Sequence, residues 1–329
     1  MMPSRAAEPA IGAGSLQNAP PSHVLCLRQQ FENFAITKNP DSKLTRDLEP
    51  GFLIPYLLEI DARTYGRWAY WIEAIERCEL PERPIPQIDW MPTAHKRTRM
   101  MLETTLNAIP RHGSWQSMGG WEYFKYLLKW MLWGFGHPGY EEPGEPEGCE
   151  GASLRVYQLL NLGPWMLFPF DYLGELLAEN AYGRKQGFFP TPMPLSVLMA
   201  EMLMGSSMED LRTKTVCDPA VGTGRLLLAA SNYSLRLYGC DIDPLMCLAT
   251  LVNGYLFAPW LVRPLPFLDG DNLDPQQSRA ISDSITAQAP PHIAETLGET
   301  EHDAAEAFRF EPIKKRRRTS EEGGQGVLF

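Results

Sequence analysis

The chain has 329 residues and a formal net charge of −10, and 44% of its residues are hydrophobic and 21% charged. This length allows one large domain or two modest ones with a real hydrophobic core, and the composition is that of an ordinary globular protein. The negative charge argues against a protein that coats nucleic acid through charge alone. Any contact with DNA would therefore be local or supplied by a partner.

The cysteines and the hydropathy pattern bear on the compartment. The six cysteines form no Cys-x-x-Cys pair and have no histidine at metal-ligand spacing, which is typical of free thiols in a reducing compartment. The sequence has no charged-then-apolar leader, and no apolar run reaches the roughly 18 residues that a membrane helix requires. We therefore expect a soluble, cytoplasmic protein.

The first half of the chain predicts a helical region. Residues 1–22 are rich in Ala, Pro, Gly and Ser and predict a disordered leader. Residues 23–180 show a helical pattern interrupted by prolines. Helices are expected over residues 56–60, 68–75, 100–109, 121–133, 154–161 and 171–178. Asp171 is the expected N-cap of the last of these helices.

Residues 121–133 are the most aromatic segment. Trp121, Phe124, Leu128 and Met131 recur at steps of three and four residues, which places them on one face of a helix. Such a face could stack on bases or lie buried in its own domain. We favour the buried interpretation, because stripes of this kind are usually core.

The second half predicts alternating strands and helices. An amphipathic helix is expected over residues 195–203, followed by strands over 215–218, 235–240 and 266–268, with helices over 225–231 and 244–257 between them. This alternation predicts an α/β fold with a parallel sheet and right-handed crossovers. Large apolar residues become rare after residue 273, so residues 274–329 predict a mostly disordered tail.

The centre of the α/β part is the segment Val216-Cys217-Asp218-Pro219-Ala220-Val221-Gly222-Thr223-Gly224. This is the pattern of a buried strand, a tight turn and the start of a helix. The glycines allow the backbone to approach a ligand where a Cβ would clash. Open α/β sheets bind ligands just outside the carboxyl ends of their strands, where this turn lies.

Acidic residues follow the next two predicted strands. Asp241 ends the second strand, about twenty residues beyond the glycine turn, at the position where an acid accepts hydrogen bonds from ribose hydroxyls. Asp271 and Asn272 follow the third. The turn contains no Gly-Lys-Ser/Thr motif, and its only cation is Arg225. These features suit a ligand with a ribose and an amine better than a polyphosphate. The alternative is an α/β domain whose glycines serve only tight turns.

Several of these segments together resemble the adenine-N6 DNA methylases, and most closely the modification subunits of type I restriction systems. The segments are residues 187–192 (GFFPTP), 218–224 (DPAVGTG), 239–244 (GCDIDP) and 270–273 (GDNL). Residues 171–177 (DYLGELL) resemble the helix that precedes the first motif. The resemblance spans residues 171–273 and is specific as a set.

The resemblance implies a partial Rossmann-like methyltransferase domain over residues 181–273, with S-adenosylmethionine as cofactor. Thr191 would hold the methionine carboxylate beside the turn, and Asp218 would face the methionine amino group. Asp241 would bind the ribose hydroxyls, Ile242 would pack on the adenine ring, and Asp271 would accept from the adenine amine. The implied cofactor-binding residues are Thr191, Asp218, Ala220, Gly222, Gly224, Asp241, Ile242 and Asp271.

The sequence departs from the family where the chemistry would take place. The family uses an Asn or Asp, two prolines and an aromatic residue to hold and stack the target adenine. The two Pro-Pro pairs here, Pro20-Pro21 and Pro290-Pro291, both follow alanine, which cannot accept a hydrogen bond. We therefore assign no catalytic residue. The strand that carries this motif in the family pairs with the first strand, so the first strand here would be an edge that the helical region or a second polypeptide must cover.

Three hypotheses follow. The first is an S-adenosylmethionine-binding component of a DNA adenine-N6 methyltransferase, as in restriction-modification, that needs a partner for methyl transfer. The second is an inactive scaffold or cofactor sensor in a DNA-associated complex. The third, weaker hypothesis is methylation of a substrate other than DNA.

The last five residues carry a separate signal. Gln325-Gly326-Val327-Leu328-Phe329 resembles the Gln-x-x-Leu-Phe peptide by which bacterial proteins bind the replicative sliding clamp. A flexible acidic tether with an apolar end could dock in a pocket in this way. The alternative is a chance pair of apolar residues.

Overall fold

A computed structural model describes residues 22–31, 34–36, 48–116, 120–180, 188–205, 210–270, 273–287 and 310–312. Residues 1–21 of the predicted leader lie outside this part of the chain, and Ser22 already begins a helix. Asp271 and the predicted clamp-binding residues Gln325, Leu328 and Phe329 also lie outside it.

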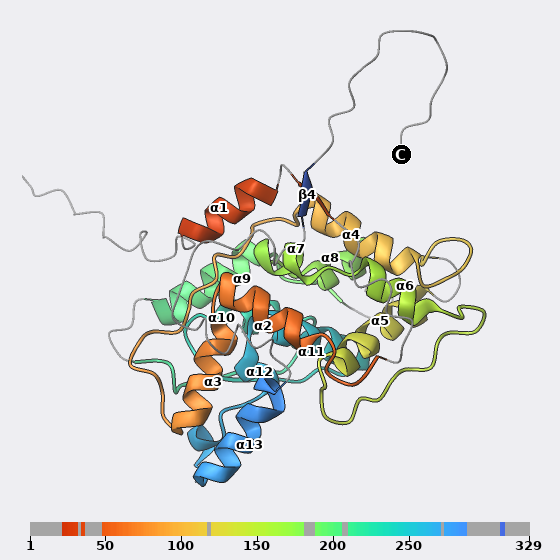
Figure 1. Cartoon of the computed structure of the whole chain (residues 1–329). Coiled ribbons are helices and arrows are strands. Elements are labelled where there is room, and N and C mark those ends of the chain that lie inside the picture. Colours follow the sequence, from red (N-terminus) through yellow and green to blue (C-terminus); the bar gives the residue numbers. More distant parts are fainter. Residues whose placement is uncertain are drawn as a thin grey trace, which may run out of the picture.

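The first half of the chain is helical, as predicted (Figure 1). Its helices are α1 (Ser22–Phe31), α2 (Ile54–Arg63), α3 (Arg67–Arg77), α4 (Lys96–Asn107), α5 (Gly120–Gly134), α6 (Ala152–Leu159), α7 (Leu162–Leu167) and α8 (Tyr172–Glu179). All six expected helices are present, whereas no separate helix was predicted at α1 or at the short helix α7. Its residues are all buried and hydrophobic or small, and so short a segment shows no helical periodicity.

Two buried carboxylates cap helices in this region. Asp171 is the N-cap of α8, as predicted, and accepts a 2.9 Å hydrogen bond from the backbone N–H of Gly174. Asp61, which is 2% exposed, accepts from the backbone N–H groups of Arg67 (3.0 Å) and Trp68 (2.8 Å) at the start of α3. Each carboxylate satisfies backbone donors that have no partner within the helix.

The aromatic stripe of α5 is part of the core. Phe124, Leu128 and Met131 are fully buried, and Trp121 is partly buried against the same cluster. Trp115 meets Trp121 and Phe124 with ring centroids 6.2 and 6.1 Å apart. The buried interpretation is confirmed, and this face does not serve as a stacking platform for bases.

The second half contains α9 (Met193–Ala200), the π-helical turn η3 (Glu201–Gly205), β2 (Thr215–Asp218), α10 (Arg225–Ala230), β3 (Arg236–Gly239), α11 (Pro244–Phe257) and α12 (Pro259–Val262). Strands β2 and β3 are parallel, and Asp218 lies opposite Gly239 at their carboxyl ends. Strand, helix, strand and helix thus follow one another as expected for an α/β unit. The ends of strands β2 and β3 and of helices α10 and α11 were predicted to within two residues.

The predicted third strand is wrong. Residues Pro266–Asp269 form a 3-10 helix, η4, instead of a strand. Pro266 removes a backbone N–H group that the predicted strand would donate to its neighbour. Proline also presets the backbone for the first turn of a helix. In the described part of the chain the parallel sheet therefore has two strands.

Strand β2 has an open edge in this structure. It pairs with β3 on one side, and no other described strand pairs with it on the opposite side. Thr215 and Cys217 are exposed, so the helical region does not cover them. Helix α9 and η3 bury only Met193, Ser196 and Ala200. The predicted amphipathic helix thus keeps much of its apolar surface in contact with solvent.

The helical and α/β parts share one hydrophobic core. Arg67 of α3 is 1% exposed and joins the two parts through hydrogen bonds to Ser231 Oγ and the Phe257 carbonyl, both 2.7 Å, and to Asn232. Burial lowers the pKa of this guanidinium to about 9. Trp68 packs on Tyr255 of α11 with ring centroids 5.9 Å apart.

Part of the predicted disordered tail is ordered. Helix α13 (Pro275–Thr286) packs against α3 and buries Ser278, Ser282 and Ile285 (Figure 1). Asp274 and Gln277 form a capping box at its start, which offsets the low apolar content of the segment. The prediction of disorder is therefore wrong for residues 275–286. A second exception is β4 (Phe310–Pro312), which pairs antiparallel with β1 (Phe34–Ile36).

None of the helices that the structure describes combines the length and apolar character needed to cross a lipid bilayer.

Candidate functional site

The glycine turn after β2 has the backbone geometry that requires glycine. Gly222 and Gly224 have φ angles of +55° and +94°, in the left-handed region. A Cβ on Gly222 would lie 3.4 Å from the ring of Phe188, and one on Gly224 would lie 3.3 Å from Thr250. Thr250 of α11 also donates a 2.8 Å hydrogen bond to the Gly222 carbonyl. The turn is therefore held close to the elements on both sides.

Two carboxylates organise the ends of the strands. Asp218 accepts from the backbone N–H of Ala220 at 3.0 Å. Asp241, just beyond β3, accepts from the backbone N–H groups of Gly222 and Asp243, both at 2.9 Å. The acid after the second strand is thus bonded directly to the turn after the first, as parallel strands that end side by side allow.

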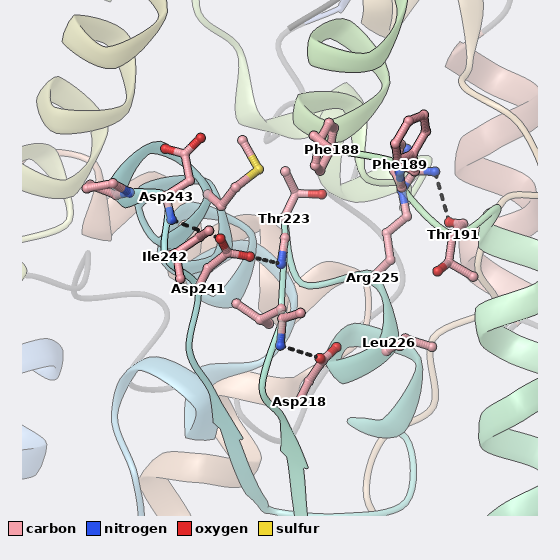
Figure 2. A pocket seen from close by; sticks show the side chains of 16 residues that line it. Phe188, Phe189, Thr191, Asp218, Thr223, Arg225, Leu226, Asp241, Ile242 and Asp243 are labelled. Carbon is pink, nitrogen blue, oxygen red and sulfur yellow. Dashed lines mark hydrogen bonds between the residues drawn. The ribbon is translucent and has the colours of Figure 1, made fainter. Parts of the chain in front are cut away.

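A pocket of about 630 Å³ lies over this turn, within the size range of small-molecule sites. Figure 2 shows Phe188 and Thr191 on one side of the turn and Asp241 and Asp243 on the other. Ile242 stands at the rim and is 99% exposed. An apolar side chain so exposed beside a pocket is available to pack on a flat ring.

The structure brings most of the predicted cofactor residues together. Those that line the pocket are Thr191, Asp218, Ala220, Gly222, Asp241 and Ile242. Gly224 lies behind the turn, where it caps α10 and contacts Thr250. Asp271 falls outside the described residues, so its placement stays a prediction.

The charge of the pocket is acidic. Asp218, Asp241 and Asp243 line it, and among the described lining residues the only cation is Arg225. The Arg225 guanidinium is 6% exposed and pairs with Asp171 at 2.7 Å and Glu175 at 3.2 Å, so its charge is already matched. The lining therefore suits hydroxyl and amine groups and disfavours a polyphosphate.

Sequence analysis missed the groups behind the turn. Asp171 was assigned only as a helix cap, yet its carboxylate also accepts from Thr223, Arg225 and Asn253. Asn253 lies in the middle of α11, and no motif around it in the sequence indicates a role for it. One signal was present, because Gly174 stands three residues after Asp171 on a helix, where glycine costs stability and so indicates a close approach.

Within the described ranges, no group of three or more His, Cys, Asp or Glu side chains is arranged to hold a metal ion. The parallel strands, the glycine turn and the acid bonded to it form an α/β unit with a pocket at the strand ends, the place where open α/β sheets bind ligands. Residues 170–256 match the family model N-6 DNA Methylase, which supports the resemblance of these motifs to the adenine-N6 DNA methylases. No solved structure matches the chain.

Proposed function

We propose that this chain binds S-adenosylmethionine in the pocket over the glycine turn, as the cofactor-binding half of a DNA adenine-N6 methyltransferase with a Rossmann-like sheet. One observation carries the proposal. Residues from three separated segments, Thr191, Gly222 and Asp241, converge on one pocket within the segment that the family model covers.

The lining fits the chemistry of this cofactor. S-adenosylmethionine supplies a methyl group on a positively charged sulfonium, and it also carries an amine, a ribose and an adenine ring. Asp241 would accept from the ribose hydroxyls, and Asp218 would face the amine. Ile242, which is 99% exposed, would pack on the adenine ring. Thr191 would hold the carboxylate at the other end of the pocket, where Arg225 donates to its backbone carbonyl at 3.1 Å.

We further propose that methyl transfer requires a second polypeptide. The Asn/Asp-Pro-Pro-aromatic motif is absent from the sequence, and β2 keeps an open edge in the described structure. Met202 and Leu203 of η3 are 72% and 78% exposed, and exposed apolar surface of this kind is common at protein interfaces. A partner that adds strands beside β2 would place their carboxyl ends at the pocket, next to the cofactor.

Two measurements test these proposals in order. Calorimetric titration with S-adenosylmethionine should show one binding site, and no heat at millimolar ligand would reject the cofactor proposal. Incubation with unmethylated DNA and labelled cofactor should give no N6-methyladenine from the chain alone. Methylation should appear when a polypeptide carrying the missing motif is added. Transfer by the chain alone would reject the need for a partner.

The alternative, an inactive scaffold or cofactor sensor in a DNA-associated complex, shares the binding step. The absence of the catalytic motif favours it. Binding without transfer in the presence of every tested partner, together with a cofactor-dependent change in DNA or protein binding, would support this alternative.

A further inference from the structure

We propose that Asp171 is a positioning residue that sets the shape of the pocket from behind, through a buried hydrogen-bond network between the helical region and the glycine turn. The residue is 0% exposed and does not line the pocket. Its two carboxylate oxygens each accept two hydrogen bonds. The proposal rests on the proposed function only where S-adenosylmethionine binding is measured.

The four bonds connect the glycine turn to three helices, α8, α10 and α11. Oδ1 accepts from the backbone N–H of Gly174 in α8 and from Asn253 Nδ2 in α11, both at 2.9 Å. Oδ2 accepts from Thr223 Oγ1 at 2.5 Å and from Arg225 Nε at 2.7 Å. Thr223 is a residue of the glycine turn itself. The carboxylate therefore fixes the turn relative to α8 and α11.

The same network reaches the Thr191 side of the pocket. Arg225, held by Asp171, donates through Nη1 to the backbone carbonyl of Thr191 at 3.1 Å (Figure 2). Asn253 Nδ2 also donates to the Thr223 carbonyl at 2.9 Å. The glycine turn and the Thr191 side of the pocket are thus tied to one buried carboxylate, and a change at Asp171 should alter the distance between them.

Close packing explains the Asp-x-x-Gly spacing. A Cβ on Gly174 would lie 2.1 Å from Asp171 Oδ2 and 2.5 Å from Thr223 Oγ1. Real Cβ atoms do not approach oxygen so closely, so only glycine lets the carboxylate and the turn meet at this point. The glycine of α8 is therefore part of the network.

Asp171→Asn is the sharpest test. All four partners of the carboxylate donate, and an asparagine has only one acceptor atom, so at least one N–H group would face another donor. The buried Arg225 would keep only Glu175, which is 32% exposed, as a charged partner. A milder variant, Asn253→Ala, removes two bonds of the network at a residue that does not line the pocket.

Asp61→Asn is the matched control. Asp61 is also a buried carboxylate that accepts from backbone N–H groups at a helix start, but it lies in the helical region away from the pocket. Its loss should lower the melting temperature without changing the turn. The comparison therefore separates a positioning role from a general loss of stability.

Two readouts should be taken below the melting temperature of every variant. We expect backbone amides 220–224 to exchange with deuterium about tenfold faster in Asp171→Asn and Asn253→Ala, and to exchange as in the wild type in Asp61→Asn. The dissociation constant for S-adenosylmethionine should rise about tenfold in Asp171→Asn, and the loosening of the turn is the cause of this rise.

The outcomes are distinct. Unchanged exchange of amides 220–224 in both network variants overturns the positioning role, even if the wild type binds S-adenosylmethionine. Should Asp171→Asn fail to fold, Asn253→Ala decides alone. Faster exchange in a protein that binds no S-adenosylmethionine supports the positioning role and rejects the proposed cofactor.

Discussion

The carboxylate of Asp241 accepts a 2.9 Å hydrogen bond from the backbone N–H of Gly222, which joins the end of β3 to the turn after β2 (Figure 2). This contact holds the carboxylate at the pocket wall, with its remaining lone pairs available to a ligand. The residue therefore has both an internal role and a proposed ligand role, and each can be measured.

Asp241→Ala should weaken S-adenosylmethionine binding about 10- to 100-fold, because hydrogen bonds to a charged group contribute about 1.5–3 kcal/mol. Calorimetry measures this change. Asp210→Ala is the control, since it removes the same charge from an exposed ion pair with Arg212 outside the pocket. Wild-type affinity in Asp241→Ala would contradict the proposed ribose contact.

Ile242→Ala should lower affinity without lowering stability. The side chain is 99% exposed in the free protein, so its truncation costs less than about 0.5 kcal/mol of folding free energy. Packing on an adenine ring would contribute about 1–2 kcal/mol, and its loss should raise the dissociation constant about 5- to 30-fold. Leu203→Ala, at a side chain 78% exposed and outside the pocket, should leave binding unchanged. Equal affinities for the two variants would count against the ring contact.

Gly224→Ala and Gly113→Ala make a matched pair for the turn. The two glycines have φ angles of +94° and +91°, so alanine should cost each about 1–3 kcal/mol of unfolding free energy. A Cβ on Gly113 meets nothing within 4 Å, whereas one on Gly224 meets Thr250 at 3.3 Å. Denaturant titration should show similar losses, and only Gly224→Ala should weaken cofactor binding. A binding defect in Gly113→Ala would indicate a global effect.

His137 should make stability depend on pH. Burial, with a smaller contribution from Arg263, lowers the pKa of His137 from 6.5 to about 4, and the imidazole contacts the Tyr255 hydroxyl at 3.1 Å. The unfolded chain binds the proton more readily between these values, so this stabilising contribution is full above pH 6.5 and is lost as the pH falls towards 4. Partial exposure reduces the effect to on the order of 1 kcal/mol.

The measurement is the difference between the wild type and His137→Gln. The buried Asp61, whose pKa burial raises to about 6, changes stability in the opposite direction over part of the same range, and its contribution is common to both proteins. Melting temperatures from pH 4 to 7 should show a smaller rise in the variant. Parallel curves would mean that His137 is not buried as the structure places it.

The predicted clamp-binding peptide is tested by deletion of residues 325–329. Loss of binding to the replicative sliding clamp is the expected result, because Gln325, Leu328 and Phe329 supply the polar and apolar side chains of the motif. A Leu328→Ala and Phe329→Ala double variant separates side chains from chain length. Clamp affinity that survives both changes would leave the motif a chance resemblance.

The local sequence determined much of this protein. The helices over residues 56–178, except α7, and the strand-turn-helix around Gly222 were predicted correctly, because apolar periodicity, caps and prolines act over a few residues. Six of the eight proposed cofactor residues line one pocket, since carboxyl ends of adjacent parallel strands meet at one sheet edge.

Tertiary structure decided the rest. Local pattern predicted a strand at residues 266–268 and disorder at 275–286, yet the first is a 3-10 helix and the second is a helix packed on α3. Neither could be predicted from periodicity. Helix α13, for example, gains its stability from a cap and from the surface of α3, which is distant in the sequence. The contact of Asp171 with Thr223 and Asn253 joins residues 52 and 82 positions apart. Only the folded chain brings such groups together, because hydrogen bonding between side chains leaves no periodic trace in the sequence.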